Sequence, residues 1–200
     1  LIAPQLDAGR LRAPITVALQ ETLGRKVEFR EVRYQIFPAP GLSAADLVIP
    51  DDPAFGLEPL AYVGEMQIGL SFSSLLAGRL TISSVRLVGA SVNLTRRDEH
   101  GWNLARLLQR MAAGAAPRIV VSEGRVNFKN GTLKSPFFLN AADLELQPPP
   151  SAGGALEWRY EASPARTDRA EQGFGRFSGG GKWRPGSGGE GEMAIDMIVE

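Results

Sequence analysis

The sequence predicts a mainly β protein: an antiparallel, strongly twisted and curved sheet with two or three short helices. Three observations predict this class. Hydrophobic residues alternate with period two in many segments, Gly- and Pro-rich breakers separate these segments, and the alternation changes phase within several of them. A strand that changes face without a turn needs a β-bulge or a sharp bend. We therefore expect curved strands with one apolar side, arranged as a β-groove or half-barrel.

The clearest phase change lies in a repeated unit. The pattern Val85-x-Leu87-x4-Val92-Asn93-Leu94 returns 34 residues later as Ile119-x-Val121-x4-Val126-Asn127-Phe128. In the first copy the apolar residues have odd numbers before the phase change and even numbers after it. In the second copy the change falls around Glu123-Gly124, and residues 26–37 show a third instance. The repeat predicts two bent strands of the same kind.

Helices are predicted at three places. The first runs from about Pro14 to Leu23 and caps one end of the sheet, with Pro14 in its first turn and Gly24 as its stop. The second spans 103–112, with Asn103 as N-cap and an apolar face that includes Leu104, Leu107, Leu108 and Met111. A short helical turn is predicted at 72–77.

Further alternating segments predict strands at 66–70, 156–162 and 193–199. The predicted breakers are 38–41, 51–53, 148–150 and the Gly-rich stretch 179–191. Strands that follow one another with turns between them favour an antiparallel meander with one apolar and one wet face.

We interpret residues 1–200 as a single domain fragment. It divides into an N-terminal helical segment (1–24), a first group of strands with the second helix (25–147), and Gly/Pro-rich loops with further strands (148–200). About ten strands make an open sheet roughly 45 Å wide, and two or three short helices do not cover a face of that width. Either the sheet closes into a sandwich or barrel, or part of the apolar face is available to a ligand.

Composition restricts the function classes. Net charge is zero, so the sequence does not predict a nucleic-acid partner. The absence of cysteine excludes disulfides and thiolate metal sites. No apolar run reaches the length of about 18 residues that a membrane helix needs. The chain begins at Leu1 and ends in a strand-like run, so we expect that an anchor or further strands lie outside it.

No motif predicts catalysis, a cofactor or a metal site. His100 is the single histidine and falls in a polar turn, while Asp51 and Asp52 before Pro53 favour a turn, with a weak Ca²⁺ site as the alternative. Gly181-Lys182 lacks the other positions of a phosphate loop. The charged stretch 166–169 is interpreted as a loop ion pair, with contact to a partner or headgroup as the alternative. We expect a protein that is not an enzyme.

The stretch from Ala18 to Arg110 resembles a known family. Its elements, in order, are Leu23-Gly24-Arg25-x-Val27, Phe37-Pro38-x-Pro40-Gly41-Leu42, Ile49-x-Asp51-Asp52-Pro53-x-Phe55-Gly56, Leu75-Leu76-x-Gly78-Arg79-Leu80, Val92-Asn93-Leu94 and Gly101-Trp102-Asn103-Leu104. This succession is similar to the N-terminal region of AsmA-like proteins of Gram-negative envelopes. The second half of the chain resembles a continuation of the same domain.

The resemblance implies a protein on the periplasmic side of the bacterial inner membrane, held there by a single-pass N-terminal anchor outside this chain. The helical segment 1–24 would then be membrane-proximal, with Arg10, Arg12 and Arg25 near anionic headgroups. It also implies a contribution to outer-membrane and envelope biogenesis through binding and conducting phospholipid along a hydrophobic β-groove. The alternative is a structural or assembly module that binds other envelope proteins through its edge strands, without a lipid.

The residues predicted to line the groove are the apolar positions of the alternating strands. They are Ile68, Leu70, Leu80, Ile82, Val85, Leu87, Val92, Leu94, Val126 and Phe128.

Overall fold

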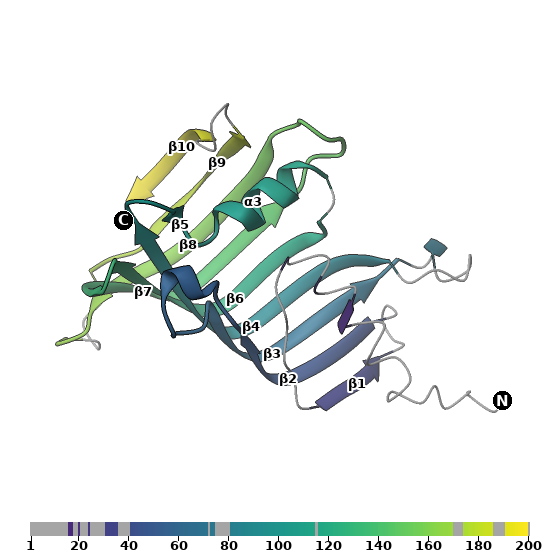
Figure 1. The fold of residues 1–200 in the computed structure, drawn as a ribbon, viewed down its shortest axis with the longest axis horizontal. Coiled ribbons are helices and arrows are strands. Elements are labelled where there is room, and N and C mark those ends of the chain that lie inside the picture. The colour runs from purple at the N-terminus through teal and green to yellow at the C-terminus, as the bar shows by residue number, and fades with distance from the viewer. Residues whose placement is uncertain are drawn as a thin grey trace.

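The computed structural model describes residues 16–17, 20, 24, 31–35, 41–71, 73–74, 81–114, 116–169, 174–185 and 191–199. Strands dominate this part of the chain, and they form one sheet that is not closed into a barrel (Figure 1). The predicted mainly β class is therefore confirmed.

The sheet has the strand order β1-β2-β3-β4-β6-β7-β8-β9-β10, and the short β5 pairs with β4. The strands are β1 (Glu31–Gln35), β2 (Gly41–Ile49), β3 (Ala61–Leu70), β4 (Ile82–Arg97), β5 (Gly101–Trp102), β6 (Arg118–Asn130), β7 (Leu133–Gln147), β8 (Leu156–Arg166), β9 (Phe177–Pro185) and β10 (Gly191–Val199).

One strand pair corrects the antiparallel prediction. β4 and β6 run parallel, whereas the other described pairs are antiparallel, so the sheet is mixed. Parallel neighbours need a crossover connection, and here it contains β5 and the α-helix α3 (Ala105–Ala112). The sequence repeat sits within this pair: Val85 pairs with Ile119, Asn93 with Asn127 and Leu94 with Phe128. The 34-residue period is therefore the length of the crossover unit.

The phase changes predicted in β4 and β6 appear within a row of backbone irregularities that crosses the sheet, whereas the one predicted at 26–37 lies mostly outside the described residues. Asp46, Gly89, Glu123 and Ala141 have φ values of 53°, 61°, 54° and 45°, one in each of β2, β4, β6 and β7. The strand register places them side by side, with Gly64 of β3 between the first two. We call these five residues the bend row. Each of these strands has one extra residue at the bend row. Because of it, the apolar side chains stay on the same face of the sheet before and after the bend.

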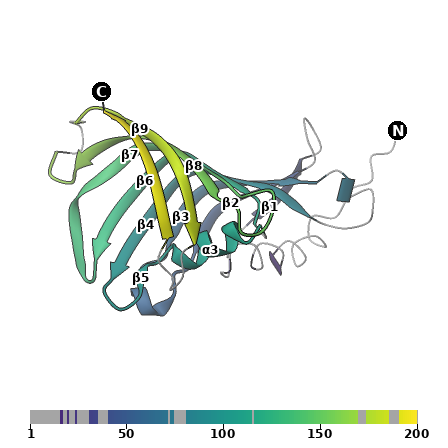
Figure 2. The same cartoon turned by 90° about the horizontal axis from the view of Figure 1, so that it is seen from above.

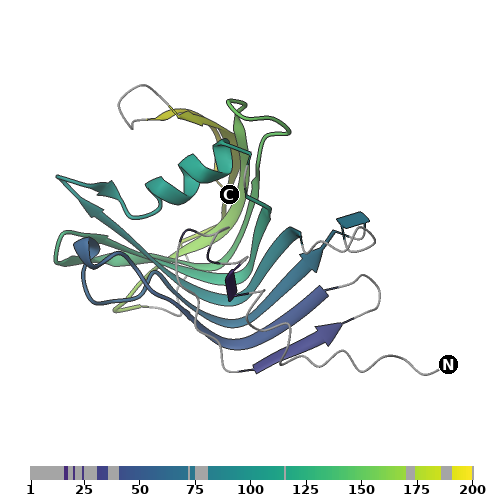
Figure 3. The ribbon, with the colours of Figure 1, turned by 45° about the vertical axis from the view of Figure 1, so that its right-hand side comes forward.

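Helix α3 lies on the apolar face of the sheet. In Figure 3 the strand ribbons curve, and α3 lies on the side toward which they curve (Figure 3). Met111 and Ala112 are buried, and Leu104, Leu107 and Leu108 pack against the same core cluster. α3 is in contact with β8 and β9, and in the view from above one end of α3 lies near the end of β9 (Figure 2). This helix covers part of the apolar face.

The predicted second helix exists, but its start is corrected. It begins at Ala105 with Leu104 as N-cap, and no side chain caps it. The amide of Asn103, predicted to cap it, is engaged with strand β4 and a neighbouring loop instead. The other two predicted helices lie mostly outside the described residues, where Thr16, Val17 and Gln20 of the first and Ser73 and Ser74 of the short turn are helical.

The breaker predicted at 179–191 is wrong for its first part, because Phe177–Pro185 forms β9. Gly181 and Gly179 are register partners of Trp158 and Tyr160 on β8, whose rings stack with centroids 5.7 Å apart. A Cβ on Gly180 would lie 2.9 Å from the Trp158 carbonyl oxygen. Large neighbours therefore supply the packing that glycine lacks.

Candidate functional site

The residues predicted to line the groove lie on the apolar face of the sheet. Ile68 and Leu70 pair with Val85 and Ile82, and Leu87 continues the same face of β4. The face extends across the parallel pair, where Val92 pairs with Val126 and Leu94 with Phe128. Nine of the ten selected residues are therefore on neighbouring strands; Leu80 lies outside the described residues.

Burial along this face differs between strands. Before the bend row, Ile68, Val85 and Leu87 are 3%, 0% and 8% exposed. Beyond it, Leu47 and Val63 of β2 and β3 are still buried, whereas the apolar residues of β4, β6 and β7 are only partly buried: Val92, Leu94, Val126, Phe128 and Leu139. The apolar face thus continues on β4, β6 and β7 past the part that the core seals. Phe128 also borders a depression that is described below.

The predicted acidic turn and the histidine lie together at one end of α3, around a depression of about 760 Å³. Asp52 accepts a hydrogen bond from the Ala54 amide (3.0 Å) and begins the 3-10 helix η1 (Pro53–Phe55), so the predicted turn is confirmed. Asp52 also forms an ion pair with Arg106 (3.0 Å). His100 lies in the β4–β5 turn with its ring against Phe55.

Asn103 holds this end of the molecule together. Its side-chain oxygen accepts from the Thr95 amide (3.1 Å), and its nitrogen donates to the Asn93 carbonyl (2.9 Å) and to Asp51 (2.6 Å). The residue is 2% exposed. Since the amide is satisfied within the fold and Asp52 is paired with a cation, we interpret this cluster as structural. Among the described residues, no group of His, Asp and Glu has the arrangement of a metal site.

A second depression, of about 440 Å³, lies on the opposite, polar face of the sheet. We call it the outer pocket. Strands β3, β4, β6 and β7, the loop before β3 and the turn after β8 contribute its lining residues: Glu58, Tyr62, Ser91, Asn93, Arg125, Asn127, Phe128, Lys129, Lys134, Ser135, Phe137, Phe138 and Thr167.

The two repeat asparagines form the floor of the outer pocket. Asn127 donates to the Asn93 side-chain oxygen (3.0 Å), and Asn93 donates to the Pro59 carbonyl (2.9 Å). Arg125 donates from Nε to Asn127 (2.9 Å), and its guanidinium carbon lies 3.7 Å above the centre of the Phe138 ring. Phe138 is 3% exposed although it lies on the polar face, where simple alternation would not place a buried ring, and the cation–π contact with Arg125 stabilises it there.

Glu58 at the rim is held by two lysines. Its carboxylate oxygens lie 2.6 Å from the Lys134 ammonium and 3.4 Å from that of Lys129. The hydrogen bond from Lys134, with a smaller contribution from Lys129, lowers the pKa of Glu58 below its ordinary value. With one carboxylate against Arg125 and the two lysines, the outer pocket carries a net positive charge.

The sequence reasoning missed the outer pocket. Its signal was present, because Asn93 and Asn127 occupy the same place in the repeat and Arg125, Asn127 and Lys129 alternate along β6. Because they alternate with apolar residues, the pattern indicates only that these positions face solvent, not that they form a pocket.

The other charged motifs have local roles. Arg166 and Asp168 form two hydrogen bonds of 2.9 Å, which confirms the predicted loop ion pair. Lys182 lies in β9 and pairs with Glu157 (2.9 Å), in agreement with the rejection of a phosphate loop.

Comparison with known proteins gives one family. The model of the AsmA family matches residues 6–196, which is nearly the whole chain. No curated protein matches the sequence significantly. Within the described part of the chain, no helix is long and apolar enough to cross a membrane. The family is associated with the bacterial envelope and with lipid-transport-related functions. On this match, and in agreement with the resemblance in its first half, the chain belongs to the AsmA family.

Proposed function

We propose that this protein binds phospholipid on the apolar face of its sheet and conducts it along that face as a groove. In this proposal an N-terminal anchor holds it in the inner membrane, the domain lies in the periplasm, and the protein is not an enzyme. Family membership supports a role in the envelope, and the chemistry of the apolar face supports a lipid as the ligand.

The observation that carries the proposal is the part of the apolar face on β4 and β6 beyond the bend row. Val92, Leu94 and Val126 continue the line of core residues but remain partly exposed. Burying one methylene contributes about 0.8 kcal/mol, so two acyl chains gain on the order of 20 kcal/mol from a long apolar surface. Such a surface does not need a specific polar site, which suits movement of the lipid along it.

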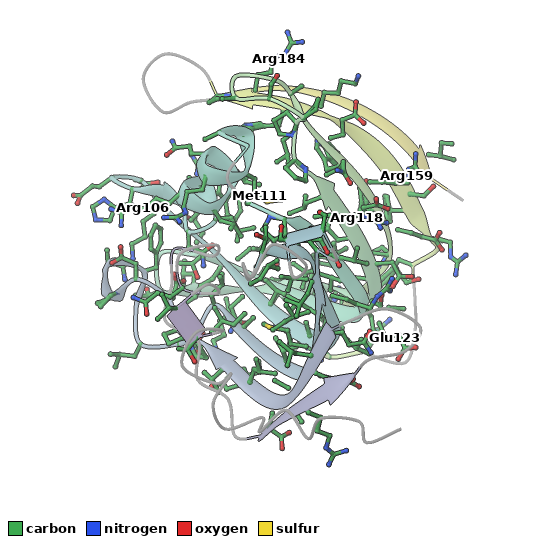
Figure 4. The ribbon with its side chains drawn as sticks, turned by 90° about the vertical axis from the view of Figure 1, so that its right-hand side faces the viewer. Arg106, Met111, Arg118, Glu123, Arg159 and Arg184 are labelled. Carbon is green, nitrogen blue, oxygen red and sulfur yellow. The ribbon has the colours of Figure 1, made fainter. Side chains whose placement is uncertain are left out.

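Photocrosslinking tests the proposal. A photoreactive residue at Val126 or Phe128, on the apolar face, is expected to crosslink to phospholipid in cells. The same residue at Arg159, an exposed position on the polar side of β8, serves as the control. In Figure 4 Arg159 points away from the molecule, whereas Met111 points from α3 toward the sheet (Figure 4).

Two results would count against a lipid ligand. One is equal crosslinking from Val126 and Arg159; the other is a purified protein whose organic extract contains no phospholipid by mass spectrometry.

The sheet edges favour a second candidate function. β1 and β10 end the strand order, and each pairs with one neighbour among the described strands. Unpaired strand edges are templates for a strand of another protein. In this alternative the protein is an assembly module for other envelope proteins. Proline substitution at Ile195 in β10 is expected to abolish co-purification of such a partner and to leave lipid crosslinking from Val126 unchanged.

A further inference from the structure

The outer pocket presents cationic groups that the fold does not fully neutralise. The Nε atom of Arg125 donates a hydrogen bond to Asn127, and one face of its guanidinium lies against the Phe138 ring. Within the described part of the chain, its two terminal nitrogens have no acceptor. A guanidinium held flat in this way keeps its fork free for an anion that accepts two hydrogen bonds.

The position of Arg125 is fixed before any ligand arrives. The ring beneath it is 3% exposed, and the asparagine beside it is anchored through Asn93 to the Pro59 carbonyl. Because the side chain is held by contacts on two sides, binding an anion costs little further conformational entropy. Arg125 is itself exposed, but these two contacts distinguish it from an exposed arginine such as Arg184, whose side chain points away from the molecule (Figure 4).

Lys129 lies on the same side of β6, four residues further along. Its side chain is 18% exposed, and Glu58 is its nearest anion at 3.4 Å. That carboxylate is shared with Lys134, which binds it more closely at 2.6 Å. Two lysines therefore already bind one carboxylate at the rim of the outer pocket. A single negative charge does not neutralise both of them.

The dimensions fit a small ligand. Four residues along a strand span about 13 Å, and the two strand spacings from Tyr62 to Arg125 span about 10 Å. The volume of about 440 Å³ falls in the ordinary range for small-molecule sites. The chain as a whole has zero net charge, so this is a local site rather than part of a basic surface.

We propose that the outer pocket binds a phosphate group, with Arg125 and Lys129 as its ligands and Glu58 as the internal anion that competes with it. The phosphate is either free or part of a small organic molecule such as a lipid headgroup. Its charged ligands lie on the face opposite the apolar one, and it shares Phe128 with the predicted groove; the proposal rests on the charged residues and does not require the lipid-binding function.

Isothermal titration with inorganic phosphate and with glycerol 3-phosphate tests it. We expect saturable binding that Arg125→Gln or Lys129→Gln weakens about tenfold or more, because each substitution removes a charge-assisted hydrogen bond. Arg184→Gln removes the same charge from β9 and is expected to leave the affinity unchanged; Figure 4 shows this side chain pointing into solvent. Thermal unfolding of each variant checks that the fold is retained.

Glu58→Gln provides the sharper test, since damage to the fold does not tighten binding. Removing the competing carboxylate frees Lys129 and Lys134, so the affinity is expected to rise severalfold. Tighter binding of glycerol 3-phosphate than of inorganic phosphate assigns the site to an organic phosphate; equal binding assigns it to the free ion. Absence of saturable binding, an equal loss in Arg184→Gln, or no gain in Glu58→Gln overturns the proposal.

Discussion

At the scale of single residues, the bend row shows how this sheet tolerates strain. Gly89 adopts its left-handed φ without steric cost, whereas Ala141 and Glu123 adopt similar values with a Cβ. The Glu123 amide is satisfied by the Asp143 carboxylate at 3.0 Å. The fold therefore maintains unfavourable backbone conformations at the positions where the strands bend.

Two reciprocal substitutions test this explanation. Ala141→Gly is expected to raise the free energy of unfolding by about 0.5–1 kcal/mol, because glycine relieves the left-handed strain. Gly89→Ala is expected to lower it by about 1 kcal/mol, although the space around its Cβ position is open. Urea denaturation measures both. The same sign of change in the two variants would contradict the explanation.

At the scale of elements, the crossover from β4 to β6 depends on a buried amide more than on helix capping. Asn103 joins the β4 backbone to Asp51, and α3 begins two residues later without a side-chain cap. The connection is therefore fixed at the base of the helix by hydrogen bonds to the sheet.

Replacement of this amide tests the point. Asn103→Ala is expected to lower the free energy of unfolding by about 2–3 kcal/mol, because it leaves buried backbone groups of Thr95 and Asn93 without their partner. Asn140→Ala, at an exposed position of β7, is the matched control and is expected to change it by less than about 0.5 kcal/mol. Equal effects would show that the amide is not structural.

Elements with strong period-two alternation were predictable, and others were not. β4, β6 and β8 follow from their apolar positions, and the bends in β4 and β6 follow from the phase change. β9 was missed because its glycines resemble a loop and its packing comes from the aromatic rings of β8. The parallel pairing of β4 and β6 was missed because alternation does not reveal strand direction.

At the scale of the whole molecule, the sequence predicted which face is apolar but not how much of it is covered. Val85 and Val126 have equivalent patterns, yet the first is fully buried and the second is partly exposed. The difference depends on which parts of the chain pack over each position, and alternation along a strand does not encode this. The outer pocket combines residues from four strands, a loop and a turn, so its composition depends on register.

The pH dependence of stability is also a property of the whole surface. Hydrogen bonds from Lys134 and Arg118 are the largest effects that lower the pKa of Glu58 and Glu145, respectively, below their ordinary value of 4.5. A carboxyl with a lowered pKa in the folded state stabilises the protein above its ordinary pKa. That stabilisation is lost as the pH falls through the folded-state value.

Denaturation at neutral pH and at a series of values below 4.5 measures this loss. Each pair is exposed, so its contribution is expected to be less than about 1 kcal/mol. Glu58→Gln and Lys134→Gln should each remove the same part of the decrease in stability. An unchanged decrease in both variants would show that the pair has no effect on folding.

The alignment of the bend row across neighbouring strands limits how the length of this chain can vary. Deletion of one bend residue would turn the rest of that strand over, moving oily side chains into water while the adjacent strands stayed as they were. Natural insertions and deletions should therefore accumulate in the hairpin tips and the crossover, and mid-strand length should stay constant among relatives.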